Sequence, residues 1–202
     1  NALPDNCFTF FQMFPGGFTP NFGGNITDTS LALGTKGEFK TGFMEGILYD
    51  FSGVVGRSES TFQLFNSVNA GKYIQLEKTF TADFVKYVPA GLYEDLTVAF
   101  GAQWTEESFE IVAGEQASWE VGPYVDQGLS NGYNGFPGFQ PQTAGTSTRR
   151  NYAAYAEVEA EFTEKLLGAL AVRFEDYDSF GTTTNYKLTG QYRLTDDWAL
   201  RA

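Results

Sequence analysis

The stretch that decides the fold runs from Asn151 to Phe180 and reads NYAAYAEVEAEFTEKLLGALAVRFEDYDSF. From Tyr152 to Phe162 every second residue is apolar or small, and glutamates occupy three of the positions between them. After the short turn Thr163–Lys165, a second run alternates Leu, Val and Phe with Arg and Glu. This strict period of two predicts two β-strands, each with one apolar and one polar face.

The same period recurs along the rest of the chain. It predicts about eight strands, at approximately 26–39, 44–60, 73–88, 96–112, 151–162, 170–175, 186–194 and from 198 to the end. The predicted connections alternate between short and long, and the longest runs from Ala113 to Arg149. Short periplasmic turns and long extracellular loops are typical of transmembrane β-barrels. We therefore predict an all-β chain that forms an antiparallel segment of a transmembrane β-barrel.

The length of the apolar face agrees with a membrane span. Tyr152 and Phe162 are ten residues apart, about 33 Å along a strand. A tilt of about 45° reduces this to about 23 Å, close to the roughly 25 Å apolar band that aromatic girdles flank in such barrels. Stacked carboxylates would be costly in a dry core, so we expect the polar face to meet a wet lumen. The residues expected to face the lumen are Glu157, Glu159, Glu161, Arg173, Glu175, Lys187 and Arg193. A soluble antiparallel sandwich, whose charged face meets bulk water, is the alternative.

Composition excludes several classes of function. The net charge of −12 disfavours a nucleic-acid partner, because phosphate binding requires a basic surface. The chain has no His, so a His-based catalytic triad and a His-ligated metal site are both excluded. Its single cysteine, Cys7, cannot form an internal disulfide or a cysteine cluster. We expect neither an enzyme nor a bound cofactor or metal ion.

Several segments resemble one broad group of TonB-dependent outer-membrane receptors. They are PGGFTPNFGG (residues 15–24), FNSVNA (65–70), LTVAFGAQWTEESFEIVAGE (96–115), GFPGF (135–139) and, most specifically, the whole of residues 151–202. The resemblance implies a barrel of about 22 strands with a plugged lumen. The chain starts without Met and ends inside a predicted strand, so we expect residues 1–202 to be one partial barrel domain, without the plug domain and the remaining strands. In relatives the loop around Cys7 can hold a paired cysteine; an unpaired thiol is the equal alternative.

The resemblance implies a receptor in the outer membrane of a Gram-negative bacterium. It implies active uptake of a scarce ligand, an iron-siderophore first of all, with energy that the TonB complex delivers through the plug. Oligosaccharide or cobalamin uptake by the same receptor type is the main alternative. A porin-like channel and a soluble carbohydrate-binding sandwich are weaker ones. The expected partners are outer-membrane lipid, lipopolysaccharide, the TonB complex and a small-molecule or oligosaccharide ligand, but no nucleic acid.

The long loop up to Arg150 is the candidate ligand site. Aromatic rings and guanidinium groups stack well on catecholates and on sugars. The candidate residues are Trp119, Tyr124, Tyr133, Phe136, Phe139, Arg149 and Arg150. The competing interpretation is that the aromatic residues pack the loop on its neighbours or belong to a membrane girdle. The two arginines could likewise contact lipopolysaccharide or pair with nearby acids.

Overall fold

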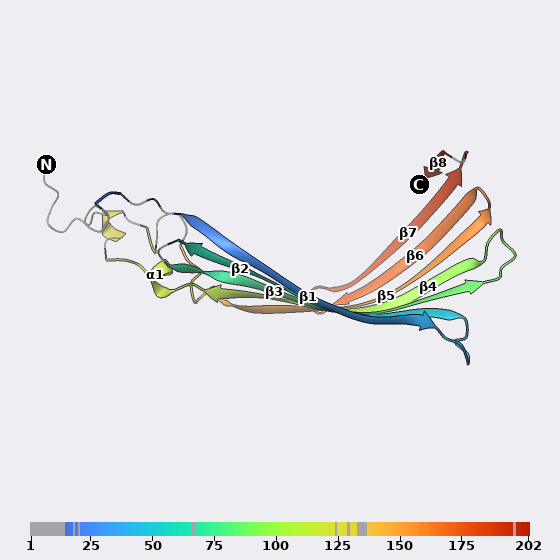
Figure 1. The fold of residues 1–202 in the computed structure, drawn as a ribbon, viewed down its shortest axis with the longest axis horizontal. Helices are drawn as coiled ribbons and strands as arrows, with labels where there is room; N and C mark the ends of the chain where they lie inside the picture. The colour runs from blue at the N-terminus through green and yellow to red at the C-terminus, as the bar shows by residue number, and fades with distance from the viewer. Residues whose placement is uncertain are drawn as a thin grey trace. The chain divides into compact units, whose positions relative to one another are not determined.

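In the computed structural model, the described residues are 15–17, 19, 21–65, 68–123, 125–128, 130–132, 137–195 and 197–202. They form a single eight-stranded sheet in which each strand is hydrogen-bonded to its neighbours in sequence (Figure 1). The strands are β1 (Phe22–Glu38), β2 (Ile47–Leu64), β3 (Asn69–Val88), β4 (Leu96–Ala113), β5 (Gly145–Thr163), β6 (Leu166–Tyr177), β7 (Gly181–Arg193) and β8 (Ala199–Arg201). The predicted all-β, antiparallel fold is confirmed.

The register of the last strands follows the predicted alternation. β5 and β6 pair antiparallel from Asn151 opposite Tyr177 to Glu161 opposite Leu167, and β6 pairs with β7 in the same sense. The helical segments are short: α1 (Gln116–Trp119) and the 3-10 turn η2 (Val125–Gln127). Within the part of the chain that the structure describes, no helix has the length and apolar character needed to cross a membrane.

The strands extend beyond the runs in which the sequence alternates. β5 begins at Gly145. Its first residues are polar and do not alternate with apolar ones, but their backbone is still part of the strand. The long connection is therefore Gly114–Ala144, and β2 and β3 are joined through Phe65–Val68 alone. The predicted short connection at 89–95 and the tight turn at 164–165 are confirmed on either side of the long loop. The predicted alternation fails at 65–68 and 178–180, which are shorter than expected because strand pairing includes residues assigned to loops, and at 39–46, which is longer than expected.

The chain divides into two compact units, which we describe separately. The first comprises Asn1–Thr29, Arg57–Leu76 and Ser108–Ser147, and includes the described parts of the long loop. The second comprises Ser30–Gly56, Glu77–Glu107 and Thr148–Ala202, and includes the cross-strand pairs of β5, β6 and β7.

Burial in the second unit is the reverse of that in a water-soluble sandwich. On the face that we call the apolar face, Leu170 of β6 is 57% exposed and its partner Leu188 of β7 is 79% exposed. On the opposite, polar face, the Glu175 side chain is only 14% exposed and Ala153 is buried. Large side chains that remain exposed over several adjacent strands mark a surface that contacts a partner or lipid.

Aromatic residues lie at both ends of the apolar face. Phe162 at the end of β5, and Tyr192 of β7 opposite Leu166, lie at the end that carries the tight turn between β5 and β6. Tyr152 of β5 and Phe174 of β6 lie toward the other end, and all four rings are exposed. This is the arrangement expected of the predicted girdles.

Candidate functional site

The long loop folds back onto the start of β3. The Phe139 N–H donates a hydrogen bond to the Ala70 carbonyl (2.8 Å), and the Gly114 N–H donates to the Phe139 carbonyl (3.0 Å). The Glu115 N–H donates to the Asn69 carbonyl (3.0 Å). These bonds link the beginning and the end of the loop to the same strand, so the loop has a fixed base.

Ser118 lies at the centre of this base and is fully buried. Its hydroxyl donates to the Glu115 carbonyl (2.6 Å), and its own carbonyl accepts the Gly138 N–H (2.8 Å). A Cβ at Gly138 would lie 2.0 Å from the Ser118 Oγ, so only glycine permits this approach. The predicted ligand residue Trp119 follows directly, half-buried, and its indole N–H donates to the Gly114 carbonyl at 3.2 Å.

Phe139 joins a group of rings in the first unit that we call the aromatic cluster. Its members are Phe22, Phe62, Tyr73, Phe109 and Phe139. Phe139 stacks on Tyr73 with ring centroids 4.6 Å apart, and it meets Phe62 edge-on at 5.7 Å. The loop thus packs through Phe139 against rings of β2 and β3. Sequence analysis missed these partners because they lie on different strands and only the strand pairing brings them together.

The seven predicted ligand residues fall into three groups. Trp119 and Phe139 belong to the folded loop base. Tyr124, Tyr133 and Phe136 lie outside the described residues. Arg149 and Arg150 are not loop residues: they lie in β5, within the second unit. The prediction that they form the base of the loop was wrong, because β5 begins earlier than its alternation suggested.

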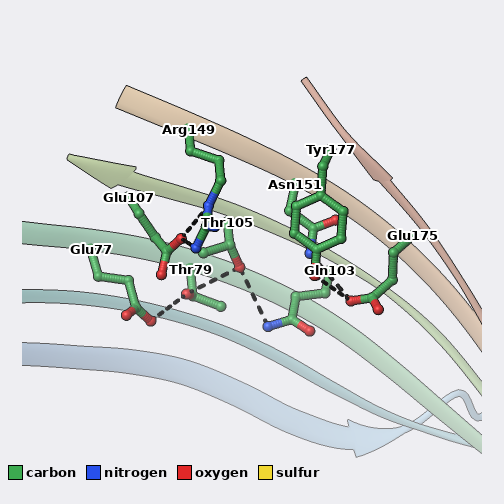
Figure 2. A network of polar contacts seen from close by, with 9 residues as sticks. All are labelled: Glu77, Thr79, Gln103, Thr105, Glu107, Arg149, Asn151, Glu175 and Tyr177. Carbon is green, nitrogen blue, oxygen red and sulfur yellow. Dashed lines mark hydrogen bonds and ion pairs between the residues drawn. The ribbon is translucent and has the colours of Figure 1, made fainter. Parts of the chain in front are cut away.

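Arg149 contributes to a polar network that extends from β3 to β6 on the polar face of the second unit (Figure 2). Its Nε donates to the Glu107 Oε2 at 2.8 Å, and its guanidinium lies 5.9 Å from the centre of the Tyr177 ring. The hydrogen bond to Glu107 raises the pKa of Arg149. The network continues with hydrogen bonds from Thr79 to Glu77, between the Thr79 and Thr105 hydroxyls, and from Asn151 and Tyr177 to Glu175. Arg149 is therefore already paired.

The predicted lumen-facing residues share the polar face. Arg173 forms an ion pair with Glu175 (Nε to Oε1, 3.1 Å), and its Nη2 donates to the Gln103 Oε1 at 2.9 Å. Its guanidinium also lies 5.4 Å from the centre of the Tyr155 ring, whose hydroxyl donates to Asp83. The remaining predicted residues are Glu157, Glu159 and Glu161, all half-buried, and Lys187 and Arg193, both exposed. Their contact with a lumen stays a prediction.

Arg150 is adjacent to Arg149 but belongs to the opposite face, because side chains alternate along a strand. Its Nε lies 2.8 Å from the Glu106 Oε2, and the Lys78 Nζ lies 2.8 Å from the Glu106 Oε1. These hydrogen bonds, first that of Lys78 and then that of Arg150, lower the pKa of Glu106. The side chains of Arg149 and Arg150 therefore lie on opposite faces of the sheet and pair with different acids.

The described residues contain no group of three or more Cys, Asp or Glu side chains placed to hold a metal ion. Cys7 and its predicted pairing lie outside the described residues.

Comparison with known proteins identifies the family. The family model for the TonB dependent receptor-like β-barrel matches residues 8–202. Among solved structures, that of the RagAB peptide transporter matches with a TM-score of 0.59 and 14% identity over 91% of this chain, which shows a common fold. The chain covers 21% of that transporter chain. No curated protein matches the sequence. The family consists of transport receptors, and the chain belongs to it: it is a TonB-dependent receptor-type β-barrel chain of the Gram-negative outer membrane.

Proposed function

We propose that this chain forms part of the wall of a receptor that actively takes up a scarce ligand, an iron-siderophore, with energy delivered through TonB. The observation that carries the proposal is the reversed burial of the second unit, where Leu170 and Leu188 are exposed and Glu175 is covered. Lipid is the solvent that favours such an exposed apolar face, while a polar face suits a wet or plugged interior.

The rest of the receptor is inferred from the family. A barrel of about 22 strands with a plug in its lumen would place residues 1–202 within one barrel domain, as a partial wall. The coverage of only 21% of the RagAB transporter chain supports this. The plug would contact the polar face, where Arg173, Glu175 and Gln103 already form a connected network. TonB would act on the plug and not on this chain.

We propose that the ligand contacts the long loop next to the aromatic cluster. Trp119 is half-buried and belongs to the loop base, which backbone hydrogen bonds hold in place. Less conformational entropy of the loop is therefore lost when a ligand binds. Tyr124, Tyr133 and Phe136 remain predicted contacts. Arg149 contributes less to ligand binding than predicted, because its guanidinium already donates a hydrogen bond to Glu107.

Aromatic side chains also stack on oligosaccharides and on cobalamin. A binding experiment with all three kinds of ligand therefore distinguishes between them. The receptor, purified in detergent, is titrated with a ferric catecholate siderophore, a linear oligosaccharide and cobalamin by isothermal calorimetry. We expect saturable siderophore binding that weakens about two- to tenfold in Trp119→Ala, the size of one aromatic contact. The control is Phe180→Ala, since Phe180 stacks on Tyr177 (4.2 Å) in another connection.

A second measurement separates active from passive transport. Uptake of the bound ligand into cells is followed before and after a protonophore collapses the proton-motive force. Uptake that stops supports the TonB-driven receptor. Uptake that continues unchanged contradicts it and indicates a porin-like channel. Binding of the oligosaccharide or of cobalamin alone would replace the siderophore but leave the receptor proposal intact.

A further inference from the structure

β4 and β5 are neighbouring strands whose register no turn fixes. They are joined by the long loop Gly114–Ala144, whereas β5 and β6 are joined by the tight turn at 164–165. In a hairpin, the turn type and the loop length fix which residues face one another, so a long loop leaves the register open. Contacts between the two strands must therefore select it.

The alternation of apolar and polar residues does not select the register by itself. A slip of one residue would move the apolar side chains of β5 to the polar face, but a slip of two residues would leave every side chain on its own face. After such a slip, Ala154, Ala156 and Val158 would still lie on the apolar face. Several registers thus expose the same apolar surface, and only specific contacts distinguish them.

Tyr155 of β5 makes a contact of this kind on the polar face. It lies directly opposite Arg173 of β6, and its ring packs on Gly101 of β4. A Cβ at Gly101 would lie 2.6 Å from the Tyr155 Cζ, so only glycine permits the ring to approach so closely. The Tyr155 hydroxyl donates a hydrogen bond to Asp83 of β3. A single side chain therefore links four neighbouring strands.

Two ion pairs also join β4 and β5, one on each face of the sheet. The Arg149 Nε donates to the Glu107 Oε2 at 2.8 Å on the polar face (Figure 2). The Arg150 Nε lies 2.8 Å from the Glu106 Oε2 on the apolar face. One step forward along β5 is matched by one step back along β4, as in any antiparallel pair, so both ion pairs belong to one register.

The contact between Tyr155 and Gly101 belongs to that same register. Tyr155 lies six residues after Arg149 on β5, and Gly101 lies six residues before Glu107 on β4. Equal and opposite steps keep facing residues together in an antiparallel pair. The aromatic contact and the two ion pairs therefore select one and the same alignment of the strands.

A slip of two residues between β4 and β5 would break all three contacts. The Tyr155 ring would then lie over Ala99 or Gln103, whose Cβ atoms prevent the close approach that Gly101 permits. The residues two positions from Asp83 on β3 carry no carboxylate, so the hydroxyl would lose its charged acceptor. The two arginines would face uncharged residues of β4. The sequence thus disfavours the registers that alternation alone leaves open.

We propose that Tyr155, packed on Gly101 and bonded to Asp83, fixes the register of β4 and β5 when the receptor folds into the membrane. Tyr155 acts as a positioning residue, and the ion pairs of Arg149 and Arg150 support it. The proposal rests on the apolar face meeting lipid, which is part of the proposed function, but not on the identity of any ligand.

The test is disulfide trapping in the receptor, with Cys7 replaced by serine, as it refolds into phospholipid vesicles. In the register described, Ala102 of β4 faces Ala154 of β5; after a slip of two residues it would face Ala156 or Tyr152. Facing Cα atoms lie about 4.5–5.5 Å apart, within reach of a disulfide, whereas diagonal neighbours lie about 7–8 Å apart and beyond it. Ala102→Cys is therefore combined with a cysteine at each of the three β5 positions in turn, and the disulfides are quantified by peptide mass spectrometry.

The unmodified strands should form the native disulfide alone. Tyr155→Ala, combined with Glu106→Gln and Glu107→Gln to remove the ion pairs, should also form a slipped disulfide. In the same double glutamine background, Tyr155→Phe keeps the ring on Gly101 and loses only the hydrogen bond to Asp83. A hydrogen bond to a charged group contributes about tenfold or more, so Tyr155→Phe should raise the ratio of slipped to native disulfide by about that factor.

The matched control is Glu157→Ala in the same background, because Glu157 lies on the same face of β5 and makes no hydrogen bond or ion pair with the described residues. It should leave the ratio unchanged. Only the native disulfide in Tyr155→Ala, or an equal slip in Glu157→Ala, would overturn the proposal. So would insertion of Tyr155→Ala with neither disulfide, since pairing itself would then be lost. If Tyr155→Ala does not insert, the ratio in Tyr155→Phe decides, and an unchanged ratio contradicts the proposal. No ligand enters this experiment, so its failure is distinguishable from failure of the transport proposal.

Discussion

Replacing Leu170 by arginine tests whether the apolar face contacts lipid. Leu170 lies midway along the apolar face of β6, between Leu166 and Phe174, and it is 57% exposed opposite Leu188. On a surface that meets water, such a substitution changes the free energy of unfolding by about 0.5 kcal/mol at most. At the midplane of a bilayer, the same substitution costs about 2–4 kcal/mol, and near the interface about 0–1 kcal/mol.

The position of each leucine therefore sets the expected magnitude. Leu170→Arg should lower the free energy of unfolding by about 3 kcal/mol, and Leu166→Arg, at the end of the face, by about 1 kcal/mol or less. The difference of about 2 kcal/mol corresponds to roughly thirtyfold in the ratio of folded to unfolded receptor. Both variants introduce the same side chain on the same strand, so helix or strand propensity does not enter the comparison.

The assay is urea unfolding of the receptor in phospholipid vesicles, followed by tryptophan fluorescence. An unchanged slope against urea shows that the same surface is exposed on unfolding. Thr189→Arg is the control, because Thr189 lies opposite Ala169 on the polar face. Costs near 0.5 kcal/mol at both leucines would refute the reasoning, as would a cost at Thr189 equal to that at Leu170.

Three further predictions concern Phe139 in the loop base, Gly71 at the start of β3, and the ion pairs of Glu106. Phe139→Ala removes two ring contacts worth about 1–3 kcal/mol together, so limited proteolysis should cut the long loop sooner, while an equal cleavage rate would contradict its anchoring by Tyr73. Gly71→Ala places a Cβ 2.4 Å from the Val112 carbonyl at a φ of +105°; thermal unfolding should show a loss above about 1 kcal/mol, and little loss in Gly56→Ala, where nothing lies within 4 Å. The pKa of Glu106 is lowered from 4.5 by Lys78 and then Arg150, so its stabilising effect is present above about pH 4.5 and lost as pH falls through the lowered pKa. The unfolding free energies of the unmodified receptor and Glu106→Gln should converge below that pH; a constant difference down to pH 3 would exclude the ion pair as the cause.

Sequence alone determined the fold class and the two faces of each strand, because alternation with a period of two is a local property that any single strand displays. It also placed Arg173 and Glu175 on one face and Leu170 on the other. Only the tertiary structure decided where β5 begins, since backbone pairing does not require hydrophobic alternation. It alone joined Phe139 to Tyr73 and gave Arg149 and Arg150 different partners, because contacts between distant residues depend on strand register and loop closure. Such contacts follow from which strands pair and in what register, and no segment read by itself contains that information.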